Sequence, residues 1–398
     1  MKIVHLADIH LGFKQYQRQT PNGLNQREAD VAVAFKRAIS KIIEIRPDIV
    51  LIAGDVFHNV RPSNPAILHA FLEFSRLVHA LPDTDVIMIA GNHDSPRSTE
   101  TGSILRLYGN LGIKVVDDDV QRIPLREGAV QVMAVPKRLN LSLPQLVPAE
   151  GEHYNVLLIH GEVEDVVPAY AAGTDRAVLG IKKKDLYLDR WDYVAFGHYH
   201  SYLPLAKKAF YSGSLEYTSP DFWAETRASD LGAAKSKGFI EFDLETKEHK
   251  FHAIELMRSV VDMPMIHGHG MSAEELNAAI REAVESCDGG IADNIVRLVV
   301  RDVPRHVLRE IDHKALREFQ RKALHFQLDA RRPDVMRHQA TGSGAPGRRA
   351  SLADTVREHL RSRAIVAGVD RDSLVDLGLK YLSEAENVAI PAAVTEIA

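Results

Sequence analysis

The sequence contains a single cysteine, Cys287, among its 398 residues. An intramolecular disulfide is therefore impossible, and CxxC redox pairs and zinc sites made of cysteines are excluded. No apolar run approaches the roughly 20 residues that a helix needs to cross a bilayer. Asp8 also comes too early in the chain for the apolar core of a secretory leader. We therefore expect a soluble, cytoplasmic protein without a membrane partner.

A surplus of positive charge is absent as well. The chain has 49 Lys and Arg against 54 Asp and Glu, which gives a formal net charge of −5. Such a protein can meet a nucleic acid only through local basic patches. Its hydrophobic content of 45% is that of a globular protein, and its length predicts two or three domains. Histidine, by contrast, is abundant, with 19 residues.

Short continuous runs of Val, Ile and Leu recur in residues 1–255, and they are typical of strands that are buried on both faces. The clearest are Ile3–Ala7, Ile49–Ala53, Val86–Ala90, Val156–Ile159 and Tyr193–Phe196. Apolar residues at helical spacing predict helices over Arg27–Ile45 and Asn64–Leu81. Strands that alternate with helices indicate a layered α/β fold. Near the end of this region, FYSGS, GFIEFDL and HKFHAIE predict antiparallel strands.

The pattern changes after residue 255. Residues 256–333 are predicted to form a small α+β domain, with strands at Val260–Met265, Ile295–Val300 and Leu324–Leu328 and helices at Ser272–Ser286 and His313–Lys322. Residues 334–350 include TGSGAPG and are predicted to be a flexible linker. Two helices are expected within 351–384, at Ser351–Arg363 and Asp370–Glu384, before a tail at 385–398. Two short helices cannot build their own core, so they should dock on a partner, on this chain or on a second copy.

Each of the five apolar strands ends in residues of the types that bind metals. In order, the motifs are D-I-H from Asp8, G-D at Asp55, G-N-H-D from Asn92, H-G at His160 and G-H-Y-H with His198 and His200. In α/β sheets, ligands gather beyond the carboxyl ends of the strands. Residues two apart on extended backbone face the same side, so Asp8 with His10, and His198 with His200, should present paired donors.

The predicted donors are carboxylate and amide oxygens and imidazole nitrogens, without sulfur. This set suits Mn²⁺, Fe²⁺ or Zn²⁺. Its members are Asp8, His10, Asp55, Asn92, His160, His198 and His200. They are too many for one ion and suit two ions that share a bridging carboxylate, the arrangement that handles phosphoryl substrates. D-I-H and G-D alone are common in proteins that bind no metal and G-N-H-D is a stronger signal, but it is all five motifs in this order that predict a metal site.

These motifs resemble the signature of the calcineurin-like metallophosphoesterase superfamily over roughly residues 1–255. More narrowly, HLADIHLGF, GDVFHNVRPS and GNHDSP resemble the DNA double-strand-break repair nuclease subunit, the SbcD type and its archaeal and eukaryotic counterparts. The resemblance implies a layered β-sandwich core flanked by helices and a DNA capping domain over 256–333. It also implies that the helix–loop–helix at 351–384 binds an SMC-like ATPase of the SbcC type.

The resemblance also assigns roles to single residues. One ion would be held by Asp8, His10, Asp55 and His200, and the other by Asp55, Asn92, His160 and His198. His93 resembles the general acid of the family, a role that imidazole suits near neutral pH. His58 resembles its supporting histidine, although an ordinary loop histidine is the alternative. Asp94 is expected to shape the turn rather than to bind metal.

We therefore predict a nuclease that uses two Mn²⁺ ions, with Fe²⁺, Mg²⁺ or Zn²⁺ as alternatives. It should have 3′–5′ exonuclease and endonuclease activity on double- and single-stranded DNA ends, and should be associated with the nucleoid. One rival is a phosphatase or cyclic-nucleotide phosphodiesterase for small molecules, which leaves the second domain and the tail unexplained. The other is a mainly architectural subunit that binds DNA ends.

Two surfaces follow from this interpretation. Candidate DNA contacts are Lys182–Lys184, Lys207, Lys208, Arg297, Arg301 and Arg305, although each could be an ordinary solvated charge. A homodimer is implied by the resemblance. The apolar surface of the helix at Asn64–Leu81 could form its interface, although such a stripe more commonly packs on the core of its own chain.

Overall fold

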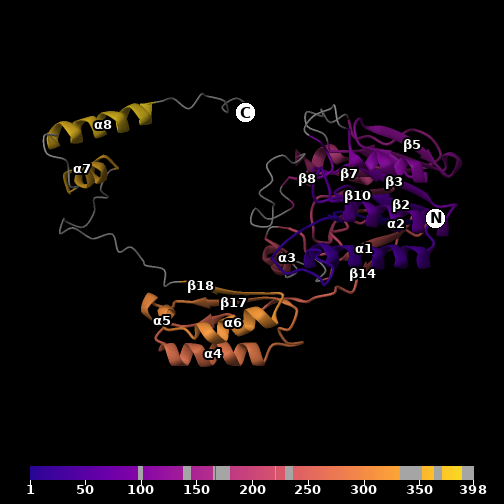
Figure 1. The fold of residues 1–398 in the computed structure, drawn as a ribbon. Coiled ribbons are helices and arrows are strands. Elements are labelled where there is room, and N and C mark those ends of the chain that lie inside the picture. The colour runs from indigo at the N-terminus through magenta and orange to yellow at the C-terminus, as the bar shows by residue number, and fades with distance from the viewer. Residues whose placement is uncertain are drawn as a thin grey trace. The chain divides into compact units, whose positions relative to one another are not determined.

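The computed structural model describes residues 1–96, 102–137, 145–164, 166, 180–219, 221–228, 236–331, 352–362 and 370–387. The chain divides into two compact units, Met1–Pro333 and Asp334–Ala398 (Figure 1). The two units are described separately below. No helix in the described part of the chain is long and apolar enough to span a membrane.

The first unit contains two six-stranded sheets. The first sheet has the order β14-β13-β1-β2-β3-β4, with β1 at Lys2–Leu6, β2 at Ile49–Ile52, β3 at Asp85–Ile89, β4 at Lys114–Val116, β13 at Gly238–Asp243 and β14 at His249–Ala253. Strands β1 to β4 pair in parallel, whereas β13 is antiparallel to both β1 and β14. The predicted strands at the N-terminus and the antiparallel GFIEFDL and HKFHAIE segments are thus confirmed.

The second sheet has the order β11-β12-β10-β7-β6-β5. Its strands are β5 at Gln121–Leu125, β6 at Val130–Val135, β7 at Tyr154–His160, β10 at Tyr193–Gly197, β11 at Leu203–Ala206 and β12 at Ala209–Tyr211. The expectation that FYSGS joins an antiparallel strand pair is only half right. Strand β12 is antiparallel to β11, but because β11 doubles back before it, β12 runs parallel to β10.

The alternation of side chains along each strand builds the layers of the sandwich. From β1 and β2, Ile3 and Leu51 point into a core between the two sheets, where they meet Val156 and Ala195 of the second sheet. Their neighbours Val4, Leu6, Val50 and Ile52 belong to a core on the other face of the first sheet. Both faces are therefore buried, which explains why these strands are continuously apolar.

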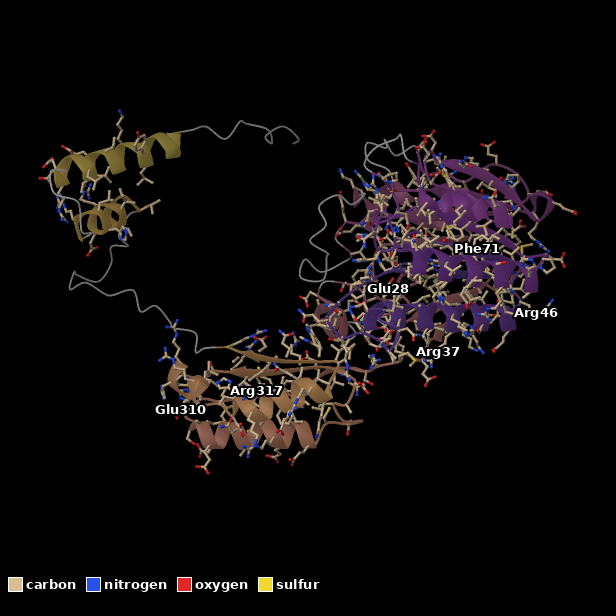
Figure 2. The ribbon with its side chains drawn as sticks, viewed as in Figure 1. Glu28, Arg37, Arg46, Phe71, Glu310 and Arg317 are labelled. Carbon is tan, nitrogen blue, oxygen red and sulfur yellow. The ribbon has the colours of Figure 1, made fainter. Side chains whose placement is uncertain are left out.

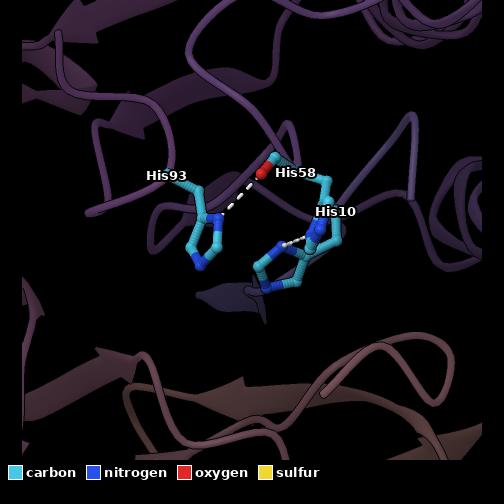
Figure 3. Close-up of side chains that lie close together, drawn as sticks. All are labelled: His10, His58 and His93. Atoms are coloured by element: carbon cyan, nitrogen blue, oxygen red, sulfur yellow. Dashed lines mark hydrogen bonds between the residues drawn. The ribbon is translucent and has the colours of Figure 1, made fainter. Parts of the chain in front are cut away.

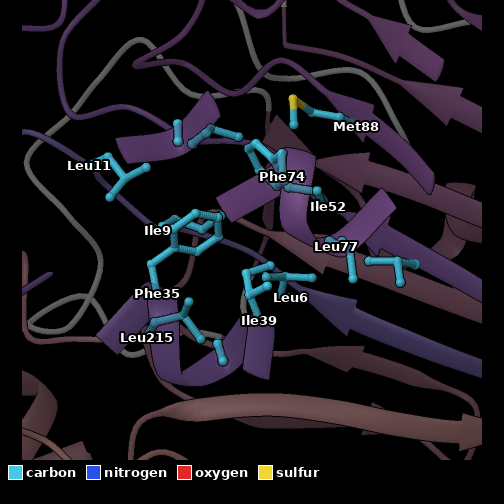
Figure 4. Close-up of a cluster of buried hydrophobic side chains, with 14 of the residues drawn as sticks. Leu6, Ile9, Leu11, Phe35, Ile39, Ile52, Phe74, Leu77, Met88 and Leu215 are labelled. Atoms are coloured by element: carbon cyan, nitrogen blue, oxygen red, sulfur yellow. The ribbon is translucent and has the colours of Figure 1, made fainter. Parts of the chain in front are cut away.

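Two long helices cover the outer face of the first sheet. Helix α1 spans Gln26–Ile45 and α2 spans Asn64–Ala80, close to the predicted bounds. Figure 4 shows Phe35 and Ile39 of α1 and Phe74 and Leu77 of α2 around this core. Glu28 in the first turn of α1 and Arg46 at its C-cap mark the two ends of that helix (Figure 2).

Several short elements complete the first sandwich. They are the strands β8 at Glu162–Val163 and β9 at Gly180–Ile181, the 3₁₀ helices η1 at Ile104–Leu111, η2 at Arg126–Gly128, η3 at Lys183–Leu186 and η4 at Leu188–Arg190, and the helix α3 at Phe222–Ala228. Helix α3 was not predicted from the sequence. Its seven residues are too few to show a helical repeat of apolar positions.

Residues 260–330 form a separate sheet around β17 at Ile295–Arg301. Strand β18 at His325–Ala330 pairs with β17 in parallel, as do β15 at Val260–Asp262 and β16 at Ile266–His267. The single strand predicted over Val260–Met265 is wrong. Pro264 lies between β15 and β16 and has no N–H to donate, so the edge of the sheet is interrupted there.

The helices of this second sheet have their own apolar core. They are α4 at Ala273–Glu285, α5 at Arg305–Arg309 and α6 at His313–Lys322. Leu276 and Ile280 of α4 pack with Val296 and Leu298 of β17 and with Phe326 of β18. Figure 2 marks Glu310 and Arg317 in this part of the chain. Helices and strands thus occur together in this segment, and its status as a separate DNA capping domain stays a prediction.

The structure contradicts one predicted DNA contact in this segment. Arg297 is only 6% exposed. Its guanidinium pairs with Asp262 and lies over the ring of Trp223, 4.6 Å from the ring centroid. A side chain held in this way is not available to a phosphate. Arg301 and Arg305 are exposed, as are Lys182–Lys184 and Lys207, and Lys208 is half-buried.

The second unit contains the predicted helix pair. Helix α7 spans Leu352–Ser362 and α8 spans Arg371–Asn387. The two helices pack closely at Gly378 of α8. A Cβ atom on this glycine would lie 2.5 Å from the side chain of Leu360 of α7. The predicted linker at 334–350 and residues 388–398 of the predicted tail lie outside the described residues.

Candidate metal centre

The five motifs follow β1, β2, β3, β7 and β10, so the first three come from one sheet and the last two from the other. The sequence predicted that the motifs converge at the carboxyl ends of the strands. It did not predict that the strands belong to two different sheets. All seven predicted ligands are brought into one region, as the distances below show. The two sheets therefore form one site at a common end of the sandwich.

The local reason given for the paired donors is wrong. Asp8, His10 and Asp55 have φ values of 51°, 52° and 52°, and His198 has 106°, so these residues are not extended. Non-glycine residues rarely adopt such a backbone, at a cost of about 1–3 kcal/mol each, and they concentrate at functional sites. Asp8 and His10 do lie together, but His198 and His200 point into different groups of ligands.

Two glycines allow the close approach of these loops. A Cβ atom on Gly91 would lie 2.1 Å from Oδ1 of Asp55, and one on Gly197 would lie 1.8 Å from the carbonyl oxygen of Ala53. Neither distance is possible for a real side chain. Glycine at these positions is thus required so that β2, β3 and β10 can bring their terminal loops together.

The first group of donors consists of Asp8, His10 and His200. Nε2 of His10 lies 3.0 Å from Nε2 of His200 and 3.7 Å from Oδ2 of Asp55. Both carboxylates are buried. Two imidazole nitrogens and two carboxylates that converge in this way form a pocket of suitable donors for one divalent cation.

The second group consists of Asp55, His160 and His198, joined by Asn92. Oδ1 of Asn92 lies 3.0 Å from Nε2 of His160 and 3.2 Å from Nδ1 of His198. Nδ1 of His160 donates to the carbonyl of Ala53 over 2.7 Å, which fixes the ring and directs Nε2 into the group. The three side chains thus present one nitrogen or oxygen each toward a common point.

Asp55 lies between the two groups. Its Oδ2 atom is 3.7 Å from Nε2 of His10 and 3.5 Å from Nε2 of His160. Its Oδ1 atom accepts the backbone N–H of His93 over 2.8 Å, so the carboxylate cannot turn freely. The position of Oδ2 is that of a carboxylate able to bridge two cations.

The charges of the site depend on strong mutual interactions. Burial raises the pKa of Asp8 to about 6, against the lowering effect of His200. Burial also acts to raise the pKa of Asp55, but His160 and His10 hold it well below its usual range. Although burial opposes it, Asp55 raises the pKa of His160 to about 9. Asp8 and Asp55 are therefore both negatively charged at neutral pH, and together they would offset the charge of a divalent cation.

His58 and His93 lie beside His10, as Figure 3 shows, and the three histidines form another set of possible metal donors. Nδ1 of His93 donates to the backbone carbonyl of His58 over 2.7 Å, which leaves Nε2 of His93 free of that bond. The two rings stack with centroids 5.2 Å apart, and Nδ1 of His58 lies 3.4 Å from Nδ1 of His10. The backbone carbonyl of His58 thus holds the ring of His93, and the ring of His58 contacts His10.

Asp94 has the contacts of a residue that shapes the turn. It is fully buried and accepts the backbone N–H groups of Val56, Phe57 and Gly91. Burial, together with the negative charge of Asp55, raises its pKa to about 7. These bonds join the loops after β2 and β3, in line with the role expected for Asp94.

Comparison with known families decides the family. The family model described as calcineurin-like phosphoesterase matches residues 1–202, about half of the chain. The chain belongs to the calcineurin-like phosphoesterase family. All five motif loops of this phosphoesterase lie within the matched residues.

Several relatives of this phosphoesterase are DNA repair proteins. It is 30% identical over 225 residues to the DNA double-strand break repair protein Mre11 of Methanocaldococcus jannaschii, covering 55% of this chain and 56% of the relative. It is 28% identical to the protein of the same name from Methanococcus maripaludis, covering 61% and 63%. It is 26% identical to a protein of Staphylococcus epidermidis named as a component of the nuclease SbcCD, covering 67% and 72%. The two Mre11 alignments thus span less than two thirds of those relatives.

Two residues of this phosphoesterase that contact a donor were missed at the level of the sequence. Oε1 of Glu225, on α3, lies 3.6 Å from Nδ1 of His200. Nζ of Lys237 donates to the backbone carbonyl of His200 over 2.8 Å. No motif surrounds either residue, and both lie beyond the matched residues 1–202. Only the folded chain brings them to His200.

Proposed function

We propose that this phosphoesterase is a DNA nuclease that processes double-strand-break ends with two Mn²⁺ ions. The observation that carries the two-ion proposal is Oδ2 of Asp55, which faces His10 on one side and His160 on the other. The names of the relatives, which are DNA repair proteins and a nuclease component, support DNA as the substrate. We include 3′–5′ exonuclease and endonuclease activity in the proposal.

The roles that we propose for the residues are those implied by the resemblance, and the distances within the site support them. Asp8, His10, Asp55 and His200 would hold one ion, and Asp55, Asn92, His160 and His198 the other. Two such ions supply Lewis-acid activation of water and neutralise charge on the phosphate. His93 then has one task, to protonate the departing sugar oxygen from Nε2. Its Nδ1–H bond to the carbonyl of His58 keeps the ring in one orientation for that transfer.

Basic residues near the site offer contacts for DNA phosphates. Strand β8 begins two residues after His160 and pairs with β9, which leads directly into Lys182–Lys184. These three lysines are exposed. The β8–β9 pair therefore brings these lysines beside the segment that follows His160, one of the proposed metal ligands. Contacts of this kind make binding weaken steeply as salt rises.

The test of the proposal is cleavage of linear duplex DNA beside a chromogenic phosphodiester, each with added Mn²⁺. We expect Mn²⁺-dependent degradation of the DNA, and DNA binding that weakens between low and moderate salt. Blocked and free DNA ends in the same assay separate endonuclease from exonuclease activity. Cleavage of the chromogenic ester with intact DNA would favour a small-molecule phosphodiesterase. DNA binding without any cleavage would favour an architectural role.

We also propose that α7 and α8 bind the coiled coil of an SMC-like ATPase of the SbcC type. The relative from Staphylococcus epidermidis is named as one component of the nuclease SbcCD. Leu377 and Tyr381 lie one turn apart on α8 and are 47% and 62% exposed, although both are large and apolar enough to anchor a helix.

Removal of all residues after Arg337 should abolish co-purification with the co-expressed ATPase. The double substitution Leu377→Asp and Tyr381→Asp should weaken it strongly, because both side chains would lose their apolar contact. Cleavage of the chromogenic ester should stay at the wild-type rate in both variants, which controls for folding. Full association of the truncated chain would show that the tail has another role.

The remaining proposal concerns a homodimer formed through α2. Leu68 and Leu72 lie one turn apart on α2 and are 58% and 57% exposed, whereas Phe74 and Leu77 of the same helix are buried in the core. Burial of a leucine is worth about 1.5–3 kcal/mol, and a two-fold axis would bury both leucines of both copies. The occupant that we propose for this surface is a second copy of the chain.

Sedimentation should therefore show a dimer, and the substitutions Leu68→Asp and Leu72→Asp together should yield a monomer. Met257, which is 49% exposed elsewhere on the unit, offers a matched control. Met257→Asp should leave the dimer intact. A wild-type monomer at all concentrations, or a dimer that persists with both leucines replaced, would refute this interface.

A further inference from the structure

We propose that Glu225 is a positioning residue for His200, and that helix α3, which carries Glu225, connects the proposed metal centre to the sheet of residues 260–330. The inference rests on the proposed metal centre but not on DNA as the substrate. Neither the motifs nor the comparisons point to Glu225, and the contacts of its carboxylate are what suggest a role.

The first observation is the orientation of the His200 ring. Nε2 of His200 faces Nε2 of His10 at 3.0 Å, on the side of the proposed ion. A histidine that binds a metal through Nε2 keeps its proton on Nδ1, and a partner for that proton fixes the ring. Nδ1 of His200 faces Oε1 of Glu225 at 3.6 Å and Oγ1 of Thr218 at 3.4 Å. Glu225 supplies the charged partner of the two.

The second observation is that this carboxylate oxygen has no competing bond. The Glu225 side chain is only 8% exposed. Among the described residues, Oε1 accepts no hydrogen bond, although it is buried. A buried carboxylate oxygen without a hydrogen bond is costly, and here Nδ1 of His200 is a donor that faces it at 3.6 Å. A small rotation of His200 would complete the bond.

The third observation explains what holds Glu225 in place. Its other oxygen, Oε2, pairs with Nζ of Lys237. Nζ of Lys237 also donates to the carbonyl of His200 over 2.8 Å and to Oγ of Ser214 over 3.0 Å. The ammonium group of Lys237 therefore bridges the carboxylate of Glu225 and the backbone carbonyl of His200.

The fourth observation extends this chain of contacts to the second sheet. Phe222 and Trp223, at the start of α3, pack with Ile295 of β17 and with Leu324. Arg297 of β17 lies over the Trp223 ring at 4.6 Å and is itself paired with Asp262 of β15. Glu225 follows Trp223 by two residues in a helix of seven. A shift of residues 260–330 would therefore move α3, and with it the partner of His200.

The experiment compares two double variants that both remove the buried ion pair. Glu225→Leu with Lys237→Met leaves only the Thr218 hydroxyl as an acceptor near Nδ1 of His200, whereas Glu225→Gln with Lys237→Met keeps an amide oxygen there as well. Binding of Mn²⁺ is measured by electron paramagnetic resonance and titration calorimetry, without any DNA. A role in the fold alone would affect the two variants equally.

We expect the leucine variant to bind one of the two ions about 10–100-fold more weakly, which is the cost of losing a partner of a metal-bound histidine. The glutamine variant should bind both ions nearly as the wild type does. Equal binding by the two double variants would overturn the role of Glu225. A wild-type protein that binds fewer than two ions would instead refute the proposed metal centre.

The connection to the second sheet has its own comparison. Trp223→Ala removes the ring between α3 and β17, whereas Phe319→Ala removes a ring that packs on Phe326 in the core of the same sheet. Trp223→Ala should weaken binding of the same Mn²⁺ ion whose binding the leucine variant weakens. Phe319→Ala should lower thermal stability but leave Mn²⁺ binding unchanged. Equal Mn²⁺ affinities in Trp223→Ala and Phe319→Ala would overturn the proposed connection between α3 and the second sheet.

Discussion

Replacement of His93 by alanine is expected to reduce DNA cleavage by about 10²–10⁴-fold, the usual contribution of a general acid, while both Mn²⁺ ions stay bound. The structure separates these two effects. The contact of residue 93 with Asp55 is made by the backbone N–H, which alanine keeps. Only the imidazole is lost, together with its bond to the carbonyl of His58. The bridging carboxylate therefore keeps its orientation.

The nature of the leaving group makes the test sharper. A sugar oxygen needs a proton as it departs, whereas a nitrophenolate does not. His93→Ala should therefore slow DNA cleavage much more than cleavage of a nitrophenyl phosphodiester, in single-turnover measurements at saturating Mn²⁺. His58→Ala tests the supporting role separately, because it removes a neighbouring ring but keeps the carbonyl that holds His93. An equal loss on both substrates, or a parallel loss of Mn²⁺ binding, would contradict the role of His93.

The donors could be found from the sequence because each one follows an apolar strand directly. A strand of four or five residues that is buried on both faces leaves a clear pattern, as in β2 and β3. Once the strands are located, the residues after them are located too. For this reason Asp55 and Asn92 could be named as candidate donors from the sequence, whereas the role of His93 came from the resemblance alone.

What the sequence could not reveal depends on contacts between distant parts of the chain. The division of the strands between two sheets is set by pairing such as that of β10 with β7, which no local pattern encodes. The burial of Arg297 depends on Trp223, far away in the sequence. The left-handed backbone at Asp8 and His10 arises from their bonds to the loop after β2, where both N–H groups donate to carbonyls of Gly54 and Asp55.

Asp55→Asn should have the largest effect on the metal centre. The amide keeps one oxygen for the backbone N–H of His93, so the loop after β3 should hold its shape. The substitution removes the negative charge that faces His10 at 3.7 Å and His160 at 3.5 Å. Because one carboxylate serves both groups, we expect the affinity for both ions to fall by more than about 100-fold. This is a larger loss than that caused by removing an outer partner of a metal ligand. Cleavage should be lost with them.

Asp94→Asn is the matched control for this variant, since it changes a second buried carboxylate that lies close to the first in the fold. Asp94 accepts three backbone N–H groups and, among the described residues, belongs to none of the groups that could hold a metal. Its substitution should cost about 1–3 kcal/mol of unfolding free energy, because an amide cannot accept all of these bonds. Mn²⁺ binding should remain. If Asp55→Asn lost only one ion, or if Asp94→Asn lost both, Asp55 would not be the bridge. The two variants together therefore distinguish a carboxylate that holds cations from one that holds loops.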